Sequence, residues 1–228
     1  MLRLQSVAMS YGQGREVLRD VDLTLRAGEF VFLVGPSASG KTSLLRLMGL
    51  MRMPSSGRFS LFDRDVTSLG QAEIGALRRR IGMVYQDVRL LDHLSVFDNI
   101  ALPLRINGGR DEQIGDVVAE MTGWLGLAEL IDVVPTRLSM GQRQLVAVAR
   151  AVITRPGLLL CDEPTGHVDD KLARRVIHLL TQFCKLGSTV VLSTHDHDLV
   201  DRYPHPILRM SQGRLSRPAA VPPTMAAD

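Results

Sequence analysis

The chain has few cysteines, little excess charge and no long uninterrupted apolar run. Only two of its 228 residues are cysteine, Cys161 and Cys184. This is too few for a disulfide framework, so a reducing compartment is expected. The richest apolar stretches are broken at Gly35 and Arg46, well short of the roughly 20 residues that a membrane-spanning helix needs. A net charge of +3 is too small to indicate a nucleic-acid-binding face.

The composition is that of an ordinary globular protein, with 45% hydrophobic and 22% charged residues. The length allows one large domain or two small ones with a sizeable core. The stretch 216–228 contains three prolines and small residues without periodicity, so we predict a disordered tail after an ordered domain at 1–215.

The apolar pattern predicts an α/β fold. Continuous apolar runs at 30–34, 158–161 and 189–193 are typical of buried parallel strands, whereas 21–25 alternates like a half-buried strand. Helical spacing at 112–127 and 140–154, punctuated by Pro103, Gly108, Gly109 and Pro135, predicts a helical subdomain at about 87–155. This subdomain would interrupt a core at about 1–86 and 156–215.

The first motif follows the run 30–34. Residues 35–42 read GPSASGKT, which matches the phosphate-binding loop GxxxxGK[ST] between a strand and a helix. Backbone N–H groups of such a loop, together with the helix N-terminus, form an anion site. Lys41 would reach the β- and γ-phosphates, and the Thr42 hydroxyl would ligate Mg²⁺.

The second motif is a carboxylate pair, Asp162 and Glu163, directly after the run 158–161. A buried strand delivers Asp162 to the carboxyl edge of the sheet, where ligands bind. Asp162 would hold Mg²⁺ through water, and Glu163 would orient and deprotonate an attacking water. Alone the pair is a weak signal, because it also fits a turn at a strand end.

A third motif, LSMGQ at 138–142, precedes a helical segment. Ser139 fits an N-cap residue, and a capped helix N-terminus is itself an anion site.

The order of these motifs resembles the nucleotide-binding subunit of ABC ATPases. The resemblance runs from Leu2 to about Leu215 and includes Gln86, the loop 166–169 and His195. It implies a P-loop NTPase (RecA-like) core with an N-terminal antiparallel β part and an inserted helical subdomain. Within the family, 84–91 and 96–104 are similar to the cell-division ATPases.

The resemblance also implies roles at matching positions. Tyr11 would stack on adenine beside Val17, and His195 would contact the γ-phosphate. The ATP-binding set is Tyr11, Val17, Gly35, Pro36, Ser37, Ala38, Ser39, Gly40, Lys41, Thr42 and Ser43. The metal set is Thr42, Gln86 and Asp162, and the catalytic set is Glu163, His195 and Gln86.

Two positions depart from the family pattern. Ala38 stands where relatives usually carry glycine, and it is strained only if its φ is positive. Met140 replaces the first glycine of LSGGQ, so slower dimer closure or turnover is expected. Ser139, Met140, Gly141 and Gln142 would act on the ATP of a second subunit, and Asp169 would cross the dimer interface.

The resemblance further implies a homodimer that closes on ATP and drives an integral membrane partner at the cytoplasmic face of the inner membrane. Val88, Leu90 and Leu91 are unusually apolar for a surface segment, and we expect them to help form the docking groove. No nucleic acid is expected. Three functions stay open: a cell-division ATPase, the ATPase of a lipoprotein-release or macrolide-export transporter, and a soluble nucleotide-gated module without a membrane partner.

Overall fold

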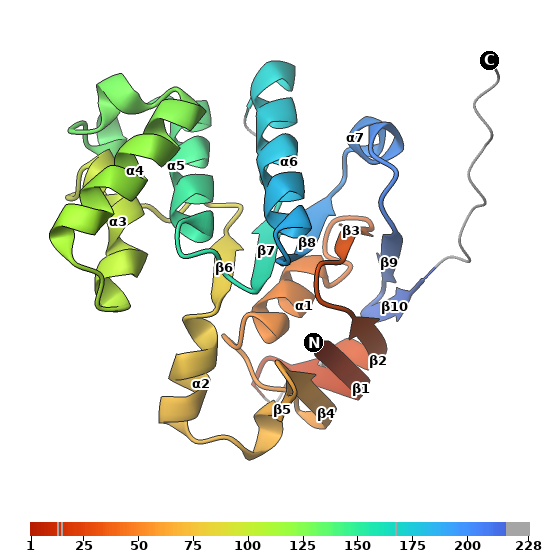
Figure 1. Ribbon diagram of the computed structural model, residues 1–228. Helices are drawn as coiled ribbons and strands as arrows, with labels where there is room; N and C mark the ends of the chain where they lie inside the picture. Colours follow the sequence, from red (N-terminus) through yellow and green to blue (C-terminus); the bar gives the residue numbers. More distant parts are fainter. Residues whose placement is uncertain (13, 15, 167, 218–228) are drawn as a thin grey trace.

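The computed structural model describes residues 1–12, 14, 16–166 and 168–217 (Figure 1). Its centre is a six-stranded sheet in the order β10-β9-β3-β8-β7-β6. β6, β7, β8, β3 and β9 run parallel, and β10 pairs antiparallel with β9. The strands are β3 (Phe30–Val34), β6 (Ile81–Val84), β7 (Leu158–Asp162), β8 (Thr189–Thr194), β9 (Ile207–Ser211) and β10 (Arg214–Ser216).

The central strands are apolar throughout because both faces of this sheet are covered. On one face Phe32, Leu159 and Val190 pack into a cluster with the helices of the chain's second half. On the other face Leu33 and Leu160 pack against α1 (Lys41–Met48) and the N-terminal sheet. Side chains alternate across a strand, so a strand buried on both sides shows no polar positions.

The N-terminal sheet is four-stranded and antiparallel, in the order β2-β1-β4-β5. It lies at the lower right of Figure 1, beneath α1. The alternation at 21–25 is the end of β2, whose outward residues are exposed. Its strands are β1 (Leu2–Ser10), β2 (Glu16–Leu25), β4 (Ser56–Leu61) and β5 (Arg64–Asp65).

Three helices gather at one side of the central sheet, at the left of Figure 1. They are α3 (Val96–Ile106), α4 (Asp111–Leu125) and α5 (Met140–Val152). All three fall within 87–155, where the sequence predicts a helical subdomain; the domain boundaries themselves stay a prediction. The other helices are α2 (Gln71–Arg78), α6 (Asp170–Lys185), α7 (His197–Arg202) and single 3₁₀ turns at Val66–Ser68, Ala128–Leu130 and Pro135–Arg137.

The predicted fold class is confirmed: two sheets of the expected kinds, with a helical insert. The break expected at Pro103 is wrong, because Pro103 lies inside α3. A proline there removes one helical hydrogen bond, the one to the carbonyl of Asn99, and the helix continues without it. Ser216, assigned to the tail, is the last residue of β10 and pairs with Arg209. The rest of the predicted tail from residue 218 lies outside the described residues.

Within the described part of the chain, no helix combines the length and the hydropathy that crossing a membrane requires.

Candidate functional site

The phosphate-binding motif forms the turn between β3 and α1. α1 begins at Lys41, and its N-cap residue Gly40 offers no side chain to the free N–H groups of the first turn. The Lys41 ammonium folds back over the loop and donates to the carbonyls of Gly35 at 2.6 Å and Pro36 at 3.2 Å. Open N–H donors and a lysine at one helix end form a site for an anion.

The loop leaves no room for side chains at its glycines. A Cβ on Gly35 would lie 2.2 Å from the carbonyl oxygen of Met210, and Gly40 has a φ of 113°. The Ser39 hydroxyl is buried and has no hydrogen-bond partner within the described residues. An unpartnered buried hydroxyl inside an anion-binding loop fits the binding of phosphate oxygens.

Ala38 has a φ of 60° and so adopts the left-handed conformation. Its side chain is exposed, so packing gives no compensation. For a residue with a Cβ this conformation costs roughly 1–2 kcal/mol. The departure from glycine at this position therefore strains the loop.

Asp162, the last residue of β7, is 3% exposed. One carboxylate oxygen accepts a hydrogen bond from the Thr42 hydroxyl at 2.8 Å, and the other accepts one from the Ser193 hydroxyl at 2.5 Å. The predicted metal residues Thr42 and Asp162 are thus in contact although 120 positions separate them. Ser193 was not predicted. Its only signal was a hydroxyl at the end of the apolar run 189–193.

Glu163 follows with a φ of 51°. Its Oε1 lies 2.8 Å from Nδ1 of His195, and the two side chains are 10% and 74% exposed. Two predicted catalytic residues are therefore in direct contact. A nearly buried carboxylate held by an imidazole is placed to accept a proton from water.

Gln86, the third predicted catalytic residue, is exposed two positions after β6. It lines a cavity of about 580 Å³ together with Thr42, Asp162 and Met140. The full lining is Thr42, Arg46, Met83, Tyr85, Gln86, Asp87, Val88, Arg89, Met140, Arg143 and Asp162. A second cavity, of about 420 Å³, has Gly35, Pro36 and His195 among its lining residues.

The oxygens around Thr42 fit a magnesium ion. No cluster of three or more His, Cys, Asp or Glu capable of holding a metal occurs in the described ranges. The candidate site instead combines a hydroxyl, a carboxylate and an amide, from Thr42, Asp162 and Gln86. These are hard oxygen donors, and Mg²⁺ commonly takes only one or two protein ligands and completes its shell with phosphate and water.

Tyr11 and Val17 lie at the edge of the N-terminal sheet. The Tyr11 hydroxyl is 3.2 Å from the Ser43 hydroxyl in α1, and the Arg52 guanidinium lies 5.3 Å from the centre of the ring. Val17 is partly buried in β2, and its carbonyl oxygen would lie 3.3 Å from a Cβ on Gly40. Both predicted adenine contacts are thus next to the phosphate loop.

Residues 139–142 of the LSMGQ motif lie at the start of α5. Ser139 Oγ accepts from Gln142 N–H at 3.2 Å, and Gln142 Oε1 accepts from Ser139 N–H at 2.9 Å, which is a capping box. Met140 is 47% exposed. No hydrogen bond joins residues 139–142 to the phosphate loop in the part of the chain that is described. Met140 nevertheless lines the same cavity as Thr42 and Asp162, whereas Ser139, Gly141 and Gln142 are not among its lining residues.

Asp169 caps α6 and accepts from Leu172 N–H at 2.8 Å. Its loop is exposed on both described sides, at Gly166 and Asp170; His167 lies outside the described residues. Cys161 and Cys184 are free thiols, and burial, with Asp162 nearby, raises the pKa of the Cys161 thiol far above its usual value.

The predicted docking residues differ in exposure. Val88 is 6% exposed, Leu90 packs against the core, and Leu91 is 36% exposed. Beside them, between α2 and α3, lies a groove of about 450 Å³. We call it the α2–α3 groove; its lining is Arg78, Arg79, Ile81, Gly82, Met83, Tyr85, Arg89, Leu102, Pro103, Ile106, Asn107, Arg150, Ala151 and Thr154.

A model of the ABC transporter family matches residues 18–166. The cell division ATP-binding protein FtsE of Escherichia coli K12 is 39% identical over 94% of this chain and 97% of its own length. FtsE of Mycobacterium tuberculosis is 39% identical over 95% of each chain. The methionine import ATP-binding protein MetN of Xylella fastidiosa is 38% identical over 94% of this chain and 65% of its own length.

Solved structures agree with these relatives. A dimeric ATP-binding cassette in a post-hydrolysis state, bound to ADP and Pi, superposes with a TM-score of 0.89 at 29% identity. The superposition covers 97% of this chain and 100% of that one. A second structure, a dimeric bacterial ABC transporter cassette, has a TM-score of 0.88 at 32% identity, over 95% and 97% of the two chains.

The strain at Ala38 is testable by substitution. Ala38→Gly should stabilise the protein by about 0.5 kcal/mol, because relief of the left-handed strain exceeds the greater entropy of glycine in the unfolded chain. The melting temperature should rise by about 1–2 °C, measured by calorimetry without nucleotide. Ala27→Gly is the control, since exposed Ala27 is not among the left-handed residues, and it should lower the melting temperature. A lower melting temperature for Ala38→Gly would contradict the assignment.

Proposed function

The chain belongs to the ABC transporter family, and from this premise we propose that it is the ATPase of an FtsE/FtsX-like complex. It binds and hydrolyses ATP as a homodimer and drives an integral membrane partner in cell division and cell-wall remodelling. FtsE relatives from several bacteria, each covered over nearly its whole length, support the cell-division role. The location that follows is the cytoplasmic face of the inner membrane, through the partner.

The observation that carries the ATPase assignment is the meeting of three segments at one edge of the sheet. Thr42 donates to Asp162 at 2.8 Å, and Glu163 contacts His195 at 2.8 Å. Phosphoryl transfer to water needs positioning and charge neutralisation more than covalent chemistry. A lysine, a hydroxyl–carboxylate pair and a carboxylate–imidazole pair next to one anion-binding loop supply both.

We assign the steps to these residues as follows. Loop N–H groups and Lys41 hold the β- and γ-phosphates. Thr42, Asp162 and Gln86 would hold Mg²⁺, which when bound neutralises charge on the phosphate oxygens. Glu163 accepts the proton of the attacking water, and His195 orients that carboxylate and contacts the γ-phosphate. Each role rests on the position of the side chain at the loop.

The homodimer completes the site. Ser139 and Gln142 are bonded to each other, and no hydrogen bond in the described part of the chain joins them to the phosphate loop. We propose that the Ser139 hydroxyl and the backbone of Gly141 contact the γ-phosphate bound by the second subunit. Asp169, exposed at the start of α6, contacts that subunit across the interface. The dimeric form of the solved cassettes supports this arrangement.

The partner is proposed to dock in the α2–α3 groove and to contact the exposed Leu91, which follows the groove residue Arg89 by two positions. Ile106 in the groove is 63% exposed, and an exposed apolar side chain beside a groove fits the binding of an amphipathic helix. Val88 is buried and lines the cavity of Thr42 and Asp162, not the groove, so we assign it no direct contact with the partner. An FtsX-like protein is the occupant that the relatives favour.

A second candidate is the ATPase subunit of a transporter, of the lipoprotein-release or macrolide-export type. A transport role in general is supported by the MetN relative, which is named for methionine import and is 38% identical, nearly as similar as FtsE. A soluble nucleotide-gated module is the third. Co-purification with a membrane protein would exclude the soluble module. The identity of that membrane protein would then distinguish the cell-division ATPase from the transporter ATPase.

Glu163→Gln tests the assignment of the base. The amide keeps the shape and a hydrogen bond to His195 but cannot accept a proton, so kcat for ATP should fall about 100-fold or more while ATP binding persists. Steady-state phosphate release measures kcat, and nucleotide titration measures ATP binding. Glu112→Gln, an exposed acid in the first turn of α4, is the control and should leave both unchanged. Full turnover in Glu163→Gln would rule out Glu163 as the base.

Met140→Gly tests the effect of having methionine in place of the first glycine of the LSGGQ motif. Removing this half-exposed side chain should let the second subunit's phosphates approach the backbone at 140–141, raising kcat about threefold at saturating ATP, a change of less than 1 kcal/mol in the barrier. Met140→Leu keeps the bulk and should match the wild type. Equal turnover in all three proteins would count against the prediction.

Ile106→Asp and Leu91→Asp test the docking groove. A carboxylate at either exposed position should abolish co-purification with the FtsX-like protein of the same organism, because burying an unpaired charge is unfavourable. ATP binding should be retained. Leu186→Asp, 77% exposed beyond α6, is the matched control and should co-purify normally. Persistent co-purification of Ile106→Asp would exclude the groove.

A further inference from the structure

The segment between β6 and α3 carries Gln86 in an unusual backbone conformation. Val88 and Arg89, consecutive and neither of them glycine, have φ values of 60° and 47°. For a β-branched residue such as Val88 this conformation is rare and unfavourable. Backbone of this kind persists only where the surrounding structure holds it in place, and it concentrates at functional sites.

The end of the segment nearest to Gln86 is held by side chains. The Arg89 guanidinium pairs with the Asp87 carboxylate at 2.9 Å and lies 4.4 Å from the centre of the Tyr85 ring. The Val88 carbonyl accepts from the Arg150 guanidinium of α5 at 3.3 Å. A turn bond from Val88 N–H to the Tyr85 carbonyl, at 3.0 Å, closes the backbone around Gln86. Gln86 therefore sits in a short closed turn.

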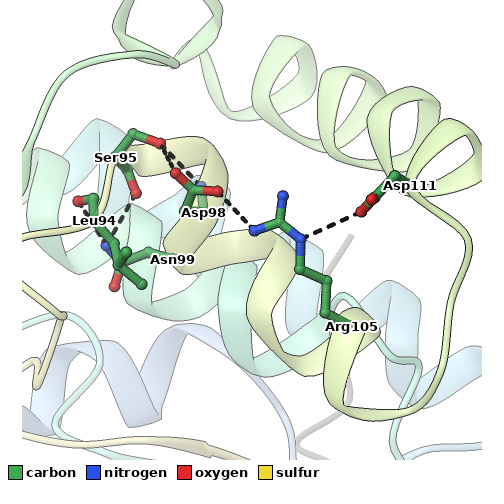
Figure 2. Close-up of polar contacts among 6 residues, drawn as sticks. All are labelled: Leu94, Ser95, Asp98, Asn99, Arg105 and Asp111. Carbon is green, nitrogen blue, oxygen red and sulfur yellow. Dashed lines mark hydrogen bonds and ion pairs between the residues drawn. The ribbon is translucent and has the colours of Figure 1, made fainter.

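The far end is held by one buried amide. Asn99 of α3 is fully buried, and its Oδ1 accepts from Leu91 N–H at 2.9 Å. Its Nδ2 donates to the carbonyls of Leu91 at 3.0 Å, Leu94 at 3.1 Å and Ser95 at 3.0 Å. Figure 2 shows the amide pointing from the helix toward Leu94 and Ser95. One side chain thus binds the backbone of 91–95 to α3.

α3 is itself fixed at this end. Ser95 caps the helix by accepting from Asp98 N–H at 3.1 Å. Arg105 bridges Asp98 at 2.7 Å and Asp111 of α4 at 3.5 Å (Figure 2), and the hydrogen bond from Arg105 lowers the pKa of the Asp98 carboxyl. The start of α3, the segment 91–95 and α4 are therefore linked by polar contacts.

We propose that Asn99 is a positioning residue for Gln86: its amide bonds hold the backbone of 91–95 on α3, and this stretch follows closely on the strained turn that carries Gln86. The proposal rests on the role of Gln86 proposed above.

The test is a double-mutant cycle on the full-length protein, with steady-state ATP hydrolysis as the readout. Asn99→Ala should lower kcat about tenfold, with the ATP dissociation constant changed less than about threefold, because only positioning is lost. In the Gln86→Ala background, adding Asn99→Ala should change kcat by less than about twofold. If Asn99 were merely structural, the double variant would lose kcat by the product of the two single reductions. That result would overturn the proposal.

Thr122→Val is the matched control for loss of a buried hydrogen bond in the same group of helices. Thr122 is fully buried in α4, and its hydroxyl donates to the Val118 carbonyl at 2.9 Å. The substitution should lower the melting temperature but leave kcat unchanged. If Thr122→Val lowers kcat as much as Asn99→Ala does, general destabilisation explains both and the inference fails.

Asn99→Asp serves if the alanine variant does not fold. It keeps the shape and the acceptor for Leu91 N–H but loses the amide donors, and the same cycle with Gln86→Ala applies. If neither variant folds, hydrogen exchange of the wild type decides. The Leu91 N–H should exchange at a rate within about tenfold of that of the Ile100 amide in α3. Much faster exchange would show that Asn99 does not hold Leu91 and would overturn the proposal. Unchanged kcat in Gln86→Ala itself overturns both this inference and the proposed role of Gln86, whereas multiplicative effects overturn the inference alone.

Discussion

The arrangement of the site depends on the hydrogen bonds that the Asp162 carboxylate accepts. It is nearly buried, and its two oxygens accept hydrogen bonds from Thr42 in α1 and Ser193 in β8. A buried charge without such partners would be strongly destabilising. The carboxylate therefore fixes the start of α1 relative to β7 and β8, and with it the anion-binding loop. Glu163, the next residue, is placed against His195 by the same two strands.

Strained backbone surrounds this anchor. Ala38 in the loop, Glu163 after β7, and Val88 and Arg89 after β6 all have positive φ. Each lies just beyond the carboxyl end of a central strand, where the rigid sheet ends and irregular backbone begins. The sheet, buried on both faces, can hold these conformations because distorting it would break core packing on two sides. Four of the eleven non-glycine residues with positive φ in the described part of the chain thus lie around the proposed chemistry.

Much of this fold could be predicted from the sequence, and the exceptions have physical causes. The strands buried on both faces were visible as continuous apolar runs, and the loop and carboxylates were visible from their spacing. β5 has two residues and β10 three, too few for periodicity to register. Pro103 was misjudged because tertiary packing tolerates one missing helical bond. The contacts Glu163–His195 and Asp162–Ser193 depend on the register of β7 against β8, which no local pattern contains.

The two parts of the proposed site differ in how firmly they are held. Lys41, Thr42, Asp162 and Glu163 stand on the central sheet and α1, whereas Gln86 and Met140 stand at the ends of segments that lead to the helices at its side. Thr42 and Asp162 of the first group line one cavity with Gln86 and Met140. A shift of the helices would therefore move Gln86 and Met140 while the phosphate-binding residues stay fixed. Nucleotide affinity and turnover can then respond separately, and this is the property that an ATPase coupled to a partner needs.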